Sequence, residues 1–249
     1  RNTRSPNLYE RYAWGRGSMA MRMVGWFGDL NGYVGDPDLD PEVAHTVSLT
    51  AGWSSGVRKD WELKVTPYYT YVEDYIGVRK VGDGGMMSPD VVYLQFANHD
   101  AELYGVNLSG SLLLADSSQF GRFALTGVAG YVHGENADTG VSLYHMMPWN
   151  GRLALTHTLG GWTSSVEVYA VAGKHNVDTV RNEMETAGYA LLNLATSYEW
   201  ETVRVDLGIK NVLDTYFEDP LAGHYYWASP RDNVPGEGRS FNAGLTLKF

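Results

Sequence analysis

Residues 203–210 read VRVDLGIK, and apolar and polar side chains alternate through this stretch. Successive side chains of a β-strand point to opposite faces, so one face would carry Val203, Val205 and Leu207. The other face would carry the charged side chains of Arg204 and Asp206. A dry core would make that second face costly, because a buried charge loses its hydration. The stretch therefore predicts a strand with an apolar environment on one side and water on the other.

This period of two recurs along most of the chain. Nine strands are predicted, at residues 42–54, 60–76, 91–114, 120–133, 149–159, 162–174, 188–200, 202–213 and 238–249. These strands are longer than the ~5–6 residues of a typical soluble strand, and they reach the roughly 9–11 residues that cross a membrane at a tilt. The 29 glycines and 17 tyrosines also favour an all-β chain.

The connections between these strands alternate in length. Short connections lie at residues 55–59, 115–119, 160–161 and Glu201, and long ones lie at 77–90, 134–148, 175–187 and 214–237. Short turns at one end and long loops at the other are typical of outer-membrane barrels. Four tryptophans stand beside short turns, where an interfacial aromatic belt is expected: Trp53, Trp61, Trp162 and Trp200. We therefore predict a transmembrane antiparallel β-barrel, with a soluble β-sandwich as the alternative.

The composition excludes several classes of protein. The chain has 249 residues and a net charge of −10, which does not favour nucleic acid as a partner. It has no cysteine, so disulfides, thiolate metal sites and thiol nucleophiles are excluded. No apolar run approaches the ~18 residues of a transmembrane helix. Serine-hydrolase, phosphate-loop and zinc-protease motifs are missing, so we expect binding and no enzymatic activity.

Three stretches of the chain resemble the TonB-dependent outer-membrane receptors. They are RSPNLYE at residues 4–10, GDPDLDPE at 35–42, and NVLDTY at 211–216 together with PGEGR at 235–239. Asp36 replaces the usual asparagine of the second stretch, and Asp40 stands where lysine is common. The last strand ends at Phe249, as the assembly signal of this family does. Nine strands is an odd number, and residues 1–41 look like the tail of a preceding strand followed by a long loop.

The resemblance implies a larger barrel than this chain can form. The family's barrel has 22 strands and is closed by an N-terminal plug, so residues 1–249 would be its C-terminal portion, with about the last nine or ten strands. It also implies a bacterial outer-membrane location, contact with lipid, and energy from the TonB complex through a plug absent from this chain. The barrel-insertion machinery would recognise strand 238–249. A passive porin or a structural or adhesive barrel is the alternative function.

The methionines suggest a metal site in the external loops. All eight fall in predicted long connections: Met19, Met21, Met23, Met86, Met87, Met146, Met147 and Met184. Thioether sulfur is a soft ligand that selects Cu(I), and imidazole also suits copper. His145 adjoins Met146 and Met147, so these three residues, with Met86 and Met87, form the predicted metal site. The alternative is that the methionines pack the loops or present an adaptable apolar surface.

Loop aromatics offer a second kind of contact. Trp26, Tyr144, Trp149 and Tyr226 are the predicted ligand-stacking residues. Aromatic side chains of long loops can equally fold the loops onto one another, so this alternative stays open. The transported ligand would be copper, haem or a siderophore-like chelate, and no resident cofactor is expected.

Overall fold

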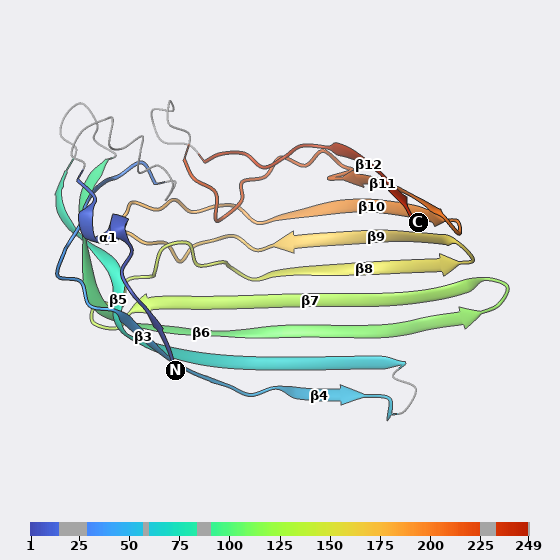
Figure 1. Cartoon of the computed structure of the whole chain (residues 1–249), viewed down its shortest axis with the longest axis horizontal. Helices are drawn as coiled ribbons and strands as arrows, with labels where there is room; N and C mark the ends of the chain where they lie inside the picture. The colour runs from blue at the N-terminus through green and yellow to red at the C-terminus, as the bar shows by residue number, and fades with distance from the viewer. Residues whose placement is uncertain (15–28, 57–59, 84–90, 225–232, 249) are drawn as a thin grey trace.

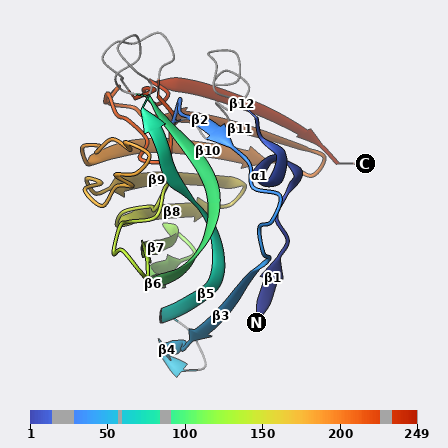
Figure 2. The same cartoon turned by 90° about the vertical axis from the view of Figure 1, so that its left-hand side faces the viewer.

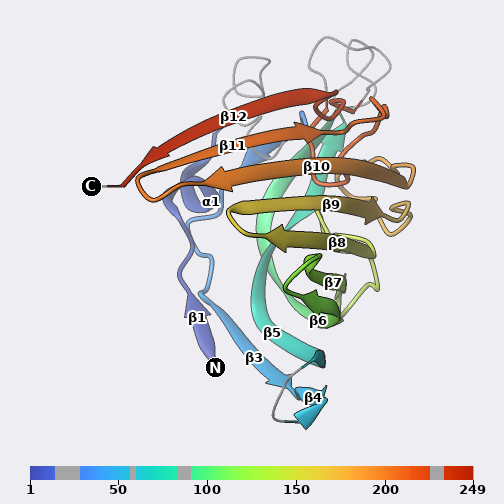
Figure 3. The ribbon, with the colours of Figure 1, turned by 90° about the vertical axis from the view of Figure 1, so that its right-hand side faces the viewer.

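The computed structural model describes residues 1–14, 29–56, 60–83, 91–224 and 233–248, which form one curved sheet (Figures 1 and 3). Its strands are β1 (Asn2–Arg4), β3 (Glu42–Ser48), β4 (Ala51–Ser54), β5 (Trp61–Asp83), β6 (Val92–Ser117), β7 (Gly121–Asn136), β8 (Asn150–Leu159), β9 (Trp162–Val171), β10 (Tyr189–Glu199), β11 (Val203–Lys210) and β12 (Ser240–Leu247). Apart from β4, which pairs with β5, they follow one another across the sheet in chain order. All of these pairs are antiparallel, so the predicted all-β antiparallel architecture is confirmed.

Two short elements lie outside that path. Strand β2 (Gly32–Val34) pairs with β6 in parallel, and α1 (Leu8–Tyr12) is the one helix of the described residues. No helix in the described part of the chain is long and apolar enough to cross a membrane. Strand β1 pairs with β3, as expected for the tail of a preceding strand.

The two ends of the sheet differ as the connection lengths predict. The short turns gather at one end, where β6 meets β7 and β8 meets β9, and the long connections gather at the other end beside α1 (Figure 1). The C-terminal strand runs toward the short-turn end (Figure 1).

The cross-strand register sorts the side chains into two sets of rows. One row runs through Leu155, Val166, Leu194 and Ile209 to Phe241, and it is apolar throughout. We call this the outer face, because in an outer-membrane barrel the apolar rows meet lipid. The opposite rows carry polar pairs such as Glu167 and Asn193, whose side chains hydrogen-bond at 2.9 Å across neighbouring strands. These rows form the inner face.

Strand β5 is longer than predicted. The alternation predicts an end near residue 76 and a loop over 77–90, but the strand continues to Asp83, so that part of the prediction is wrong. A β-bulge between Val72 and Tyr75 explains the error, since Asp74 there has a positive φ of 55°. A bulge adds one residue to one strand and resets the alternation, so the periodic signal stops where the strand does not.

The predicted single strand over residues 42–54 is interrupted. It forms β3 and β4, which both pair with β5 and are separated by Leu49 and Thr50. The gap lies opposite Pro67, which has no N–H to donate to the ladder. The break therefore follows from one residue on the neighbouring strand.

The first resembling stretch forms a joint between β1, α1 and β3. Asn7 caps α1, accepting the backbone N–H of Glu10 at 2.8 Å, while the Glu10 carboxylate accepts the N–H of Asn7 at 2.8 Å. The Arg4 guanidinium pairs with Glu10 at 2.9 Å and with Glu42 at 2.7 Å. One arginine thus links the helix to the start of β3.

The third stretch forms a second joint, at the end of β11. Asn211 is buried, and its amide hydrogen-bonds Thr215 in both directions at 2.8–2.9 Å. Asp214 accepts the backbone N–H of Arg239 at 2.9 Å. These contacts close the long connection between β11 and β12 at its base. Asn211 and Asp214 of the resembling stretch therefore have a structural role.

The long-loop end carries a packed layer. We call it the loop layer and define it as residues 8–14, 29–41, 75–83, 91–99, 137–149 and 172–186. Its main core cluster contains Tyr33, Ile76, Leu94 and Phe96, with Tyr33 stacked on Phe96 at 5.3 Å between ring centroids. Figure 2 shows the ends of β5 and β6 sweeping past β2 and α1 to form this layer.

Candidate functional site

Five predicted site residues lie in one segment of the loop layer. Tyr144, His145, Met146, Met147 and Trp149 all fall between the end of β7 and the start of β8. The other four lie outside the described residues: Trp26, Met86, Met87 and Tyr226.

His145 has an unusual backbone conformation. Its φ of 59° lies in the left-handed region, which non-glycine residues adopt rarely. The backbone N–H of His145 donates to Glu183 Oε1 at 3.0 Å, and its ring stacks on Tyr144 with centroids 3.8 Å apart. Burial lowers the pKa of His145 below its ordinary value. Neutral imidazole is the form that binds metal ions.

Tyr144 lies beside a buried arginine. The Arg181 guanidinium carbon lies 4.8 Å from the Tyr144 ring centroid and 5.5 Å from that of Tyr33. Burial raises the pKa of Tyr144 well above its ordinary value. A desolvated cation–π contact is worth about 2 kcal/mol. These contacts fold the loops together, and contact of Tyr144 with a ligand stays a prediction.

Met146 packs against the second core cluster of the long-loop end, which contains Val72, Ala101 and Leu143. A Cβ placed on Gly134 would lie 2.8 Å from the Met146 sulfur, so this glycine leaves the room that the thioether occupies. The contact supports the packing alternative for Met146 without testing metal binding. Among the described residues, no three histidine, cysteine, aspartate or glutamate side chains are grouped to hold a metal ion. The predicted metal site combines one histidine with methionine sulfurs, which that grouping does not include.

Trp149 lies beside the membrane-facing aromatics. Its ring stacks on Tyr131 with centroids 5.1 Å apart and an interplanar angle of 15°. Tyr131 belongs to the outer face, and the next outer row joins Tyr69, Tyr104 and His133 in register. Aromatic residues on this face are typical of a membrane–water interface. This position favours an interfacial role for Trp149, and its contact with a ligand stays a prediction.

Two hollows flank the 144–149 segment. One, of about 400 Å³, lies between the ends of β5 and β6, residues 136–144 and residues 178–181, and its lining includes Tyr75, His99 and Tyr144. The other, of about 300 Å³, is lined by residues that include Met146, Trp149 and His175. Small-molecule sites have volumes of roughly 300–1,000 Å³, so each hollow could hold part of an organic ligand.

Sequence reasoning missed a buried polar network in the loop layer. Asn31 donates to Asp29 at 3.0 Å and to the carbonyl of Arg181 at 2.7 Å, and Arg181 donates to the Tyr33 hydroxyl at 2.8 Å. The Tyr33 hydroxyl in turn donates to Asp29. No local pattern marks these residues, because Arg181 and its partners Asn31 and Tyr33 lie about 150 positions apart in the chain.

A second buried hub centres on Glu183. Its carboxylate accepts the ammonium of Lys174, which is 2% exposed, and the backbone N–H groups of His145 and Asp178. A buried charge is tolerated when it is paired and hydrogen-bonded, and Glu183 meets both conditions. The hub fixes residues 174–186 against the 144–149 segment.

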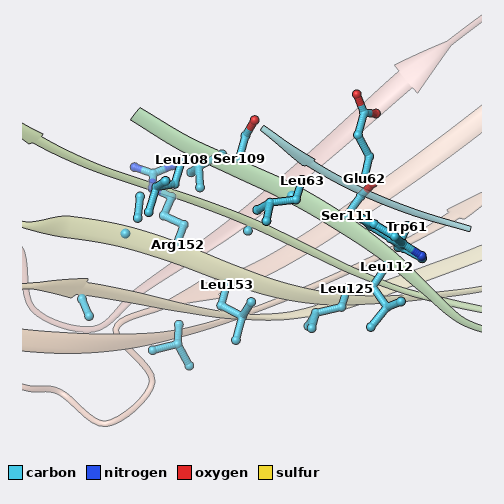
Figure 4. A pocket seen from close by; sticks show the side chains of 17 residues that line it. Trp61, Glu62, Leu63, Leu108, Ser109, Ser111, Leu112, Leu125, Arg152 and Leu153 are labelled. Carbon is cyan, nitrogen blue, oxygen red and sulfur yellow. The ribbon is translucent and has the colours of Figure 1, made fainter. Parts of the chain in front are cut away.

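A third hollow, of about 710 Å³, lies on the wall of the sheet, away from the loop layer. Its lining alternates bulky residues such as Leu63, Leu112 and Leu153 with Gly110 and Gly127. Figure 4 shows these leucines pointing to one side of the sheet while Glu62 points to the other. The hollow therefore belongs to the outer face, where acyl chains would fill it, and it is a poor candidate for a ligand site.

The fold and the two faces define an outer-membrane β-barrel segment, and comparison with known proteins gives the family. The model of the TonB-dependent receptor-like β-barrel family matches residues 1–212. The chain therefore belongs to this family, whose members are transporters of the bacterial outer membrane and not enzymes. No curated protein sequence matches the chain.

Solved structures of receptors in this family share the fold. The chain is similar to the copper transporter OprC, with a TM-score of 0.77 and 22% identity over 99% of this chain and 37% of that one. A mutant ferric enterobactin receptor PfeA from Pseudomonas aeruginosa gives a TM-score of 0.69 and 17% identity over 99% and 37%. The ferric citrate transporter FecA gives 0.64 and 14% over 84% and 32%. The chain thus spans little more than a third of the length of the first two receptors.

Proposed function

We propose that residues 1–249 are the C-terminal portion of the barrel domain of a receptor that binds a scarce metal or metal chelate at its external loops. The whole protein would import this ligand with energy from the TonB complex, transmitted through a plug outside this chain. The observation that carries the proposal is the loop layer, because a passive pore has no need of an ordered outer layer with its own core. Family membership supports it.

Two observations bear on the ligand. His145, Met146 and Met147 are consecutive and lie in the loop layer, which supports a soft metal such as Cu(I). The 400 Å³ hollow beside Tyr144 supports an organic chelate or haem, because such ligands need a site of that size. The proposal therefore stays at the level of a metal or a metal chelate.

Uptake by intact cells tests the function. The full-length receptor would be purified from its native membrane, and its bound metal and organic ligand would be measured by elemental analysis and mass spectrometry. Cells without the receptor should lose energy-dependent uptake of that ligand. Equal uptake with and without a working TonB complex would favour the passive porin instead.

A methionine variant tests the metal form of the ligand. Met146→Leu with Met147→Leu keeps apolar volume and removes both sulfurs, so loop packing should survive while Cu(I) binding is lost. Met184→Leu, in a different part of the loop layer, is the matched control. If the double variant binds copper as the parent does, the methionines pack the loops and the chelate is the better ligand.

We further propose that the barrel-insertion machinery recognises strand 238–249. Deleting Phe249 should lower outer-membrane assembly strongly, because the resemblance to the family implies that Phe249 is part of the recognition signal. Removing one phenylalanine side chain costs at most about 1.5–3 kcal/mol even where the side chain is fully buried, which is small for a large barrel. Normal surface levels after the deletion would refute this recognition.

A further inference from the structure

A continuous column of rings and one guanidinium crosses the loop layer. It begins at Tyr9 of α1, whose ring meets Phe96 edge-on at 5.9 Å, and Phe96 stacks on Tyr33 at 5.3 Å. Arg181 follows Tyr33, then Tyr144, and the column ends at His145. Its members come from five segments: α1, residues 29–41, β6, residues 137–149 and residues 172–186. Arg181 is the charged member, and it connects the two halves.

Buried carboxylates hold Arg181 in this place. Its guanidinium pairs with Asp178 at 3.2 Å and lies 4.0 Å from Asp29, and the side chain is 8% exposed. Burial alone would lower the pKa of Arg181, but Tyr33, Asp29 and Asp178 raise it above its ordinary value. The guanidinium is therefore a fixed cation whose plane is available to the rings beside it.

The turn that carries Arg181 also carries Glu183. Asp178 Oδ1 accepts the N–H of Arg181 at 3.2 Å, and the N–H of Asp178 donates to Glu183 Oε2 at 2.7 Å. One turn thus contacts the Tyr144 ring through Arg181 and the His145 backbone through Glu183. Left-handed backbone at a non-glycine residue persists only where surrounding contacts over-determine it, and this turn supplies such contacts.

We propose that Arg181 is the positioning residue of the Tyr144–Met147 segment, and that Glu183 assists it. The inference rests on the proposed function, because it assigns the receptor a preformed external site. In that site Arg181 fixes the ring of Tyr144 directly, and its turn fixes the backbone of His145 through Glu183, before a ligand arrives. Arg181 acts in this role through Tyr144 and His145.

Chemical footprinting of the full-length receptor in outer-membrane vesicles tests this role without any ligand. Arg181→Met removes the charge and the planar group, so the 144–147 segment should open. Carbethoxylation of His145 and oxidation of Met146, both read by peptide mass spectrometry, should rise at least about tenfold, a factor that corresponds to 1.4 kcal/mol. The exposed His175 should react at an unchanged rate. Unchanged protection of His145 and Met146 would overturn the proposal.

Two further variants separate positioning from charge balance. Arg181→Lys keeps a cation for the buried carboxylates but lacks the flat guanidinium, so it should expose His145 as Arg181→Met does. Full protection in the lysine variant would show that charge alone suffices and would overturn the proposal. Glu183→Gln keeps an acceptor for the His145 N–H, so it should expose His145 less than Arg181→Met does. Equal or greater exposure would mean that Glu183 is the main positioning residue and would overturn the leading role of Arg181.

Arg152→Met is the matched control. Arg152 also covers a tyrosine, with its guanidinium carbon 4.9 Å from the Tyr169 ring centroid, but both lie on the barrel wall. This variant should leave His145 protected. If it exposes His145 as strongly as Arg181→Met does, the effect is a general loosening and the proposal fails. Since the footprint needs no ligand, a receptor that binds neither copper nor a chelate would refute the proposed function and leave this test intact.

Discussion

The barrel wall and the loop layer place their apolar side chains differently. Large apolar residues of the wall, such as Leu153, Leu207 and Phe241, are more than half exposed, since they would face lipid. The buried apolar residues of the described chain all lie in the loop layer or in the parts of the strands next to it: Ala13, Tyr33, Leu39, Val72, Ile76, Val91, Val92, Leu94, Phe96, Ala101, Leu143 and Val171.

One chain therefore uses two kinds of stabilisation. The wall is held by backbone ladders between neighbouring strands, and lipid covers its apolar rows. The loop layer stands in water, so it needs its own core and buried ion pairs such as Arg181 with Asp178. Substitutions in one region should therefore leave the other region folded.

The largest effect is expected from Tyr33→Ala. Tyr33 is fully buried, stacks on Phe96 and hydrogen-bonds Asp29 and Arg181, so its loss should cost the loop layer about 3–5 kcal/mol. Protease added to intact cells should cut the loops much faster, while the heat resistance of the barrel in detergent stays unchanged. Tyr104→Ala, on the outer face, is the control that should leave the loops resistant. If the barrel lost its heat resistance together with the loops, the two regions would not be stabilised separately.

The next effect belongs to the wall. Leu207 lies in an outer row with Thr196 and Ala243, so Leu207→Arg should cost about 2–4 kcal/mol near the membrane midplane. Arg204 lies on the inner face, where it pairs with Asp206 at 2.7 Å, and Arg204→Leu should cost much less. Assembly into vesicles measures both variants. Equal assembly of the two would mean that the faces are assigned incorrectly.

The sequence predicts the wall better than the loop layer, for a physical reason. Alternation between lipid and water is a local signal, so residues 202–213 predict a strand and its two faces, and β11 (Val203–Lys210) lies within that range. The bulge at Asp74 and the gap opposite Pro67 break this signal because each depends on a single residue.

The candidate site shows the same division. The clustering of Tyr144, His145 and Met146 in one loop follows from their adjacency in the chain. Their contacts with Arg181 and Glu183 do not follow from the sequence, because residues about 40 positions apart produce no local pattern that would predict a contact. Such contacts become visible only when the loops are placed side by side.

A smaller effect is expected from Gly134→Ala. The added methyl group would meet the Met146 sulfur at 2.8 Å and Leu143 at 3.0 Å, and overpacking of this kind costs about 1–3 kcal/mol. Hydrogen exchange of residues 141–147 should speed up. Gly208→Ala is the control and should change little, because a Cβ placed on Gly208 would lie 3.7 Å from its nearest neighbour, the carbonyl oxygen of Leu194. If Gly134→Ala leaves exchange unaltered, Met146 does not pack as described.

The smallest effect is expected at the cap of α1. Asn7→Ala removes the acceptor for the Glu10 N–H and should cost about 1 kcal/mol. Faster hydrogen exchange confined to residues 8–13 would measure it. Asn7→Ser retains a capping oxygen and should restore protection; a serine variant that behaves like alanine would show that the cap does not stabilise α1.

Capture of an external ligand requires that the loop-layer end of the sheet faces the outside of the cell, and cysteine labelling measures this directly. The chain has no cysteine, so single cysteines can be introduced at Asp138 in the loop layer and at Ser118 in a short turn without background from this segment. An impermeant thiol reagent on intact cells should label Asp138→Cys and leave Ser118→Cys unlabelled until the outer membrane is broken. Labelling of Ser118→Cys with Asp138→Cys silent would contradict the account, because the loop layer would then face the periplasm and could not capture a ligand from outside.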